Sequence, residues 1–173
     1  SNEARLATKA MIEKDGPCYF RTCRPAVECV TDQFADYSFE IGKGIELVDG
    51  TDVTIIACGI MVQEALKAQK LLEKEGIHAR VIDMHTIKPI DREMIIKAAK
   101  ETGAIVTVEE HNVIGGLGSA VAEVIVQTEN VPMEFVGVQD KFGHSASPTV
   151  LLKHYGLCPE NIAEKAKKAI DRK

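Results

Sequence analysis

Three segments of this sequence carry residue types that could do chemistry, and each is expected where a strand ends and a helix begins. The first joins Glu109-Glu110-His111 to Gly115-Gly116-Leu117-Gly118. Glycines let backbone N–H groups point at an anion, and a helix N-terminus favours negative charge. A tight turn that brings helix and strand close together is the favoured alternative, since neither a Walker loop nor G-x-G-x-x-G is present. The candidate anion-binding residues of this loop are Gly115, Gly116, Gly118 and His111.

Two further loops offer weaker candidates. Residues 85–91, His-Thr-Ile-Lys-Pro-Ile-Asp, contain His85 and Lys88, which could meet a phosphate, although an exposed lysine is usually only solvated. Residues 139–145 bring an acid, a histidine and a hydroxyl together, but show no nucleophile elbow or triad order, so an exposed interface loop is favoured. No histidine has metal-ligand spacing. We therefore predict no metal-binding residue, and these loops by themselves name no reaction.

Two arginines near the N-terminus form another candidate, in Arg21-Thr22-Cys23-Arg24-Pro25. The planar guanidinium group binds phosphate or carboxylate in a bidentate manner. A spacing of three in an extended strand directs Arg21 and Arg24 to opposite faces, so both need not reach one ligand. A surface ion pair explains either arginine equally well.

The elements expected to position these residues follow from hydrophobic periodicity. The sequence has 173 residues, of which 45% are hydrophobic and 27% charged, enough for one folded domain and too apolar for disorder. Four strands alternating with helices predict a parallel sheet, and the strand before the Asp49-Gly50 turn adds an antiparallel edge through a hairpin-type turn. The expected fold is α/β, a three-layer αβα sandwich with a mostly parallel five-stranded sheet. The predicted strands are 18–22, 45–48, 53–58, 79–83, 104–108 and 133–138, the first of them outside this sheet; the predicted helices are 3–14, 61–75, 91–101, 119–127, 148–155 and 159 onward.

Charge and cysteine content exclude several classes of protein. The formal net charge of −5 argues against a nucleic-acid partner. No apolar run approaches the roughly 18 residues of a membrane span, and no secretory signal is present, so no membrane partner is expected. Five cysteines without a C-x-x-C pair argue against a disulfide framework or a structural zinc. A reducing cytoplasm is the expected location.

The organisation along the chain is uneven. Residues 1–29 predict one helix and one strand with nothing further to pack on, which is typical of the tail of a neighbouring domain. Residues 30–44 lose periodicity and are interpreted as a linker. Residues 45–173 hold the regular α/β pattern and are interpreted as a domain of their own.

An ordered series of motifs resembles the transketolases. Gly16 to Pro25 (GPCYFRTCRP) resembles the stretch that ends their pyrimidine-binding domain, and FEIGKG at 39–44 resembles the linker that follows it. DVTIIACG at 52–59, TIKPID at 86–91 and TVEEH at 107–111 with GGLG at 115–118 resemble motifs of their C-terminal domain. The series runs end to end, in order and with matching spacing.

This resemblance implies an enzyme that transfers a two-carbon ketol unit between sugar phosphates with thiamine diphosphate and Mg²⁺, in active sites formed between two subunits. It assigns the substrate phosphate to Arg24, whereas Arg21 stays a weaker substrate-binding candidate through its guanidinium group alone. Cys23 replaces the usual serine. The cofactor-binding and catalytic residues of the family lie upstream. The chain is thus expected to be a C-terminal section that is inactive and binds neither cofactor nor metal alone.

The same resemblance implies the partners and leaves alternatives open. The expected partners are the upstream transketolase domains or an N-terminal subunit, in a homodimer or heterotetramer. Deoxyxylulose-phosphate synthase and the beta subunit of 2-oxo-acid dehydrogenases share this C-terminal fold and are ranked second. A stand-alone anion-binding regulatory module is the alternative from a different class.

Overall fold

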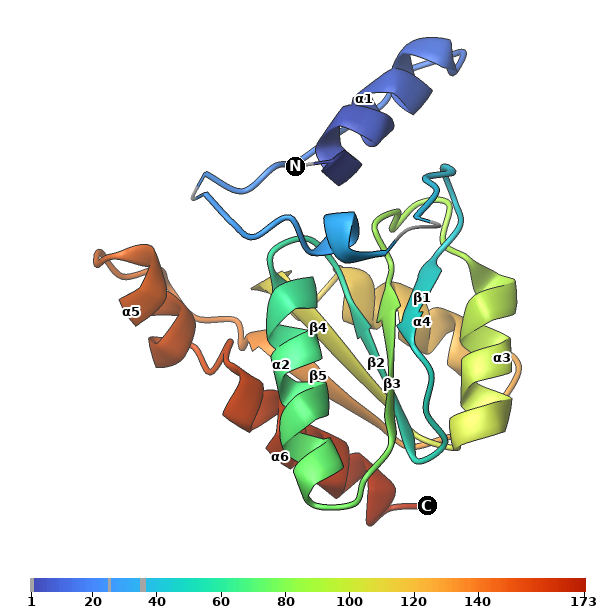
Figure 1. The fold of residues 1–173 in the computed structure, drawn as a ribbon, viewed down its shortest axis with the longest axis vertical. Coiled ribbons are helices and arrows are strands. Elements are labelled where there is room, and N and C mark those ends of the chain that lie inside the picture. The colour runs from blue at the N-terminus through green and yellow to red at the C-terminus, as the bar shows by residue number, and fades with distance from the viewer. Residues whose placement is uncertain (1, 25, 35–36) are drawn as a thin grey trace.

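A five-stranded sheet lies at the centre of the molecule, with helices on both faces (Figure 1). The structure is a computed structural model and describes residues 2–24, 26–34 and 37–173. The strands, in the spatial order β1-β3-β2-β4-β5, are β1 (Ile45–Val48), β2 (Val53–Ala57), β3 (Ala79–Asp83), β4 (Ile105–Asn112) and β5 (Met133–Val138). All pairs are parallel except β1–β3. The predicted fold, mostly parallel with one antiparallel edge strand, is confirmed.

The helices begin and end where local signals place them. They are α1 (Asn2–Glu13), η1 (Val30–Gln33, a 3₁₀ turn), α2 (Met61–Lys74), α3 (Arg92–Thr102), α4 (Leu117–Ile125), α5 (Pro148–His154) and α6 (Pro159–Ile170). Asp91 caps α3 by accepting a hydrogen bond from the Met94 N–H at 3.1 Å. Gly103, with φ of 66°, ends the same helix in the left-handed conformation.

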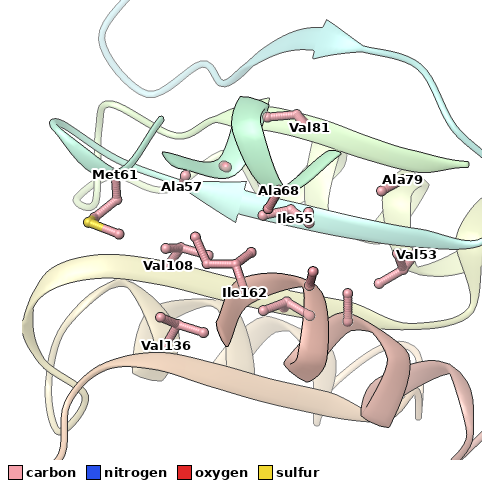
Figure 2. Close-up of a cluster of buried hydrophobic side chains, with 14 of the residues drawn as sticks. Val53, Ile55, Ala57, Met61, Ala68, Ala79, Val81, Val108, Val136 and Ile162 are labelled. Carbon is pink, nitrogen blue, oxygen red and sulfur yellow. The ribbon is translucent and has the colours of Figure 1, made fainter. Parts of the chain in front are cut away.

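The sheet separates two hydrophobic cores. Because successive side chains of a strand point to opposite faces, Ile55 contributes to the core under α2 and α6, while Ile56 contributes to the core under α3 and α4. Figure 2 shows the first of these cores, in which Ile162 of α6 approaches Val108 and Val136 of the sheet. The alternation fixes which face each helix covers, and so where each connecting loop emerges.

The expected hairpin between β1 and β2 is wrong. β2 pairs on its two edges with β3 and β4, so β1 pairs instead with the outer edge of β3. The turn that joins β1 to β2 is bound to the start of β3, where the N–H groups of Thr51 and Asp52 both donate to the His78 carbonyl. A Cβ on Gly50 would lie 2.4 Å from Ala79, so this glycine permits the close approach.

Other boundaries also differ from the prediction. Residues 18–22 form no strand, because no neighbouring strand among the described residues offers them a hydrogen-bonded ladder. β4 continues through Glu109 to Asn112, where it pairs with Val138 after a register shift. α4 starts at Leu117 instead of Ser119. Within the described residues, no helix has the length and apolar character needed to cross a membrane.

Candidate functional site

The glycine loop between β4 and α4 is closed around a carboxylate of the chain itself. Glu109 Oε2 accepts a hydrogen bond from the Leu117 N–H and Oε1 accepts one from the Gly118 N–H, each at 2.8 Å. Glu109 is buried, and its negative charge faces the positive end of the helix dipole. The N–H groups of Leu117 and Gly118, which an external anion would need as donors, are therefore already bonded to Glu109.

The local packing and backbone conformation explain why glycine occupies three positions of this loop. A Cβ on Gly116 would lie 1.9 Å from Glu109 Oε2, and a Cβ on Gly118 would lie 2.4 Å from the Phe135 ring. Gly115 has φ of 77°, and its N–H donates to Ser119 Oγ at 2.8 Å. This geometry supports the close-packing alternative, whereas binding of an external anion stays a prediction.

His111 borders the loop without entering it. Its exposed ring places Nδ1 2.9 Å from the Asn112 carbonyl and 4.0 Å from Glu109 Oε2. The Asn112 side chain donates to Asp140 Oδ1 at 2.8 Å and accepts from the Ile114 N–H at 2.8 Å. The glycine loop and the 139–145 loop are thus joined at the carboxyl end of the sheet.

The two candidate arginines differ in what they contact. The Arg21 Nη2 donates to the Glu110 carbonyl at 2.7 Å, which ties the N-terminal segment to the end of β4. Arg24 is exposed and makes no hydrogen bond or ion pair with any residue that the structure describes. Since residues 18–22 are not a strand, the expected opposite-face geometry does not apply. Pro25, the last residue of the motif, lies outside the described residues.

The 85–91 loop contributes one cation, not two. The His85 ring stacks on Phe39 with centroids 4.1 Å apart, and burial lowers its pKa to about 4, so it is neutral near pH 7. Lys88 is exposed and borders an open pocket of about 380 Å³ that also touches Gly115, Gly116 and Arg92. Because Glu123 also lines this pocket, its charge is mixed.

The 139–145 loop belongs to an arm that projects from the domain with α5 (Figure 1). Tyr155 organises it, because its hydroxyl donates to the Phe142 carbonyl at 3.0 Å and lies 2.8 Å from His144 Nδ1. Phe142 is 96% exposed, and every residue from 139 to 150 is exposed. Among the described residues no hydrogen bond joins Ser145 to His144, so these loop residues form no catalytic triad.

Sequence reasoning missed two features of this edge of the sheet. One is the capping role of Glu109, which acts on N–H groups eight and nine residues further along the chain. The other is Asp83, the fully buried last residue of β3, which the sequence showed only as one more strand residue. An acid at the end of a predicted strand (Asp83) or directly after one (Glu109) was the available signal.

The fold defines the class of the chain as an α/β domain built on a mostly parallel sheet. The sequence model of the family "Transketolase, C-terminal domain" matches residues 42–162. The chain belongs to this family.

Relatives of known name align with most of this chain. A "putative transketolase C-terminal section" of Methanocaldococcus jannaschii is 48% identical over 158 residues, covering 91% of this chain and 49% of that protein. A 1-deoxy-D-xylulose-5-phosphate synthase of Heliobacterium modesticaldum is 40% identical over 171 residues, covering 98% of this chain and 26% of that protein.

One solved structure has nearly the same backbone. It is described as a split-gene transketolase in an inactive beta4 tetramer, and it matches with a TM-score of 0.90 at 48% identity, covering 97% of this chain and 56% of that one. The chain thus spans about half the length of its split-transketolase relatives.

The described residues do not fit the diphosphate and metal ion that the resemblance to transketolases implies. They contain no group of three or more His, Cys, Asp or Glu side chains arranged to hold a metal. The N-terminus of α4, which follows the glycine loop, is occupied by the Glu109 carboxylate. None of the five cysteines forms a disulfide bond with another described residue. No chemical step through the cofactor is therefore derived from these residues.

Proposed function

We propose that this chain is the C-terminal section of a transketolase, an enzyme that moves a two-carbon ketol unit between sugar phosphates with thiamine diphosphate held elsewhere in the complete enzyme. The relatives named as transketolase sections and subunits support the reaction class. The section serves subunit assembly and one contact to the substrate phosphate, and it is inactive alone.

The observation that carries the substrate contact is the contrast between Arg21 and Arg24. Arg21 is engaged by a backbone carbonyl, whereas the exposed Arg24 has no partner among the residues described. A free guanidinium group at this position suits a sugar phosphate, which it binds through charge-assisted hydrogen bonds. Arg24 is therefore the proposed phosphate contact.

The test is ketol transfer from xylulose 5-phosphate to ribose 5-phosphate, with thiamine diphosphate and Mg²⁺. It is run on the chain alone and on the chain combined with its upstream portion. Activity only in the combined sample supports the proposal. Activity of the chain alone contradicts the assignment of the chemistry to the upstream portion.

In the combined enzyme, Arg24→Ala is expected to raise KM for phosphorylated sugars about ten- to a hundred-fold, the effect of losing a contact of about 1.5–3 kcal/mol. An unphosphorylated ketose donor should be affected much less. The matched control is Arg5→Ala, which removes an exposed arginine of α1 whose contact is to Asn2. Equal KM values for both variants would remove Arg24 from the site.

Deoxyxylulose-phosphate synthase is the second candidate, because relatives of that name match 98% and 95% of the chain at 40% and 36% identity. Pyruvate-dependent CO₂ release in the combined sample, without transfer from xylulose 5-phosphate, would favour it. A stand-alone anion-binding module has less support, since Glu109 already occupies the loop donors.

A further inference from the structure

The 139–145 loop holds a large apolar side chain in water on a fixed backbone. Phe142 is almost entirely exposed. The Tyr155 hydroxyl donates to the Phe142 carbonyl at 3.0 Å and accepts a hydrogen bond from the His144 N–H at 3.0 Å. Because Tyr155 also packs against a hydrophobic core of the domain, the backbone of Phe142 is tied to the body of the protein.

The other side of Phe142 is fixed through Asp140. Asp140 has φ of 49°, a left-handed backbone conformation that few residues with a side chain adopt. Its carboxylate accepts a hydrogen bond from the Asn112 side chain at 2.8 Å, which joins the loop to the end of β4. Ordering a loop costs backbone entropy, and unusual backbone conformations concentrate at functional sites. The exposed Phe142 therefore has the properties of a preorganised contact for another molecule.

Two other exposed apolar side chains belong to segments that meet the same end of β4. Ile114 lies in the glycine loop, just after the strand. Phe20 precedes Arg21, whose Nη2 donates to the Glu110 carbonyl of β4 at 2.7 Å. We call Phe20, Ile114 and Phe142 together the β4-end surface. Exposed apolar side chains that gather in one region mark interaction sites more often than scattered ones do.

The position of Arg24 indicates which partner the β4-end surface faces. Arg24 is three residues from Arg21, so it lies within about 11 Å of the residue that is bound to the end of β4. Under the proposed function, Arg24 contacts a sugar phosphate that reacts on thiamine diphosphate held by the upstream portion. The upstream portion must then approach this edge of the sheet. The split-transketolase relatives are about twice as long as this chain, so they carry a further segment of domain size.

We propose that Phe142 is the anchor through which this chain docks on the upstream, cofactor-holding portion of the transketolase, with Phe20 and Ile114 completing the apolar contact. The inference rests on the proposed function, because that function places the upstream portion against Arg24. The pocket that receives Phe142 is apolar, since an aromatic side chain contributes most to binding where water is excluded from it. A second copy of this chain is the competing occupant of the surface.

Hydroxyl-radical footprinting tests the proposal on the chain alone and on the chain combined with its upstream portion. The oxidation rate of the Phe142 side chain should fall several-fold in the combined sample, because docking removes the ring from water. Val126 is the internal control, since it is an exposed apolar residue at the C-terminal end of α4, the end away from the glycine loop. Its oxidation rate should be the same in both samples.

Variants of the loop test the same contact through affinity, measured by sedimentation velocity at several concentrations. Phe142→Ala should raise the Kd of the complex about ten- to a hundred-fold, the loss expected for a buried aromatic anchor. The fold should be unaffected, because this side chain is exposed in the chain alone. Tyr155→Phe removes only the hydroxyl that fixes the loop, so it should raise the Kd by a smaller factor. Val126→Ala is the matched control and should bind as the native chain does.

Several results would overturn the docking proposal. They are the absence of a complex, an unchanged oxidation rate of Phe142 in the complex, and equal Kd values for Phe142→Ala and the native chain. Protection of Phe142 that grows with the concentration of the chain alone would identify a second copy as the occupant and would also overturn it. Failure of the proposed function is a separate result: a complex that protects Phe142 but transfers no ketol unit contradicts the transketolase assignment, whereas an active complex with an exposed Phe142 contradicts the docking contact alone.

Discussion

At the scale of single residues, Glu109 decides what the glycine loop can do. A carboxylate at a helix N-terminus satisfies N–H groups that would otherwise lack partners and interacts favourably with the helix dipole. Because Glu109 holds this position from within β4, it connects the strand to α4 directly. The loop therefore has a structural role, and an anionic ligand at this edge of the sheet would need hydrogen-bond donors from other residues.

Gly116→Ala is expected to destabilise the protein by about 1–3 kcal/mol, because the new methyl group would displace the Glu109 carboxylate and leave buried N–H groups without acceptors. Urea unfolding measures the change. Gly143→Ala is the matched control, since a Cβ there meets nothing within 4 Å and the backbone is not left-handed. Equal stabilities of the two variants would contradict the role given to Glu109.

At the scale of elements, ion pairs as well as apolar contacts hold the C-terminal helix α6 and the residues after it against the edge strand β5. Glu134 of β5 faces Lys165 at 2.9 Å, Lys168 at 3.1 Å and Arg172 at 2.7 Å. Burial opposes ionisation of Glu134, but the hydrogen bonds and charges of Lys165 and Lys168 outweigh it and lower the pKa below 4.5. The last helix thus complements the exposed edge of the sheet.

Glu134→Gln should lower stability at pH 7 by about 0.5–1 kcal/mol, a value kept small because solvent screens these partners. A lowered carboxyl pKa stabilises the fold above the ordinary value of 4.5, and this stabilisation is lost as the pH falls through the folded-state pKa. The difference from the native chain should therefore vanish in acid, as followed by thermal unfolding from pH 7 to 3. Glu164→Gln, at an exposed position of α6, should show no such pH-dependent difference.

At the scale of the whole molecule, the N-terminal segment contributes little to the hydrophobic cores. Along the chain, the first buried residue of either hydrophobic core is Leu47, and the first partly buried residue that packs against a core is Val27. α1 contributes Ala7 as its buried residue, and Figure 1 shows this helix standing clear of the sheet. We therefore expect the domain to fold without the N-terminal segment.

Removing residues 1–24 should leave a cooperative unfolding transition and lower the free energy of unfolding by no more than about 1 kcal/mol, since the cores stay intact. Removing residues 159–173, a shorter segment, should abolish folding because Ile162 and three alanines of α6 are core residues. Circular dichroism and urea titration distinguish these outcomes. Loss of cooperative unfolding in the first deletion would show that the N-terminal segment is part of the domain.

The sequence by itself determined the elements whose signals are local. β3 and β5 have the predicted bounds, and α3 has its cap and its terminating glycine as expected, because apolar runs, Asp91 and Gly103 act within a few residues. The family was also readable, since its motifs are contiguous in the chain.

Only the tertiary structure decided which residues meet across the chain. The partner of β1 and the target of the Glu109 carboxylate both join segments separated in sequence. The same holds for the missing strand at 18–22, because a strand exists only where a neighbour supplies its hydrogen bonds. Hydrophobic periodicity states which face of an element is buried, but the element that covers this face is set by the packing of the whole sheet.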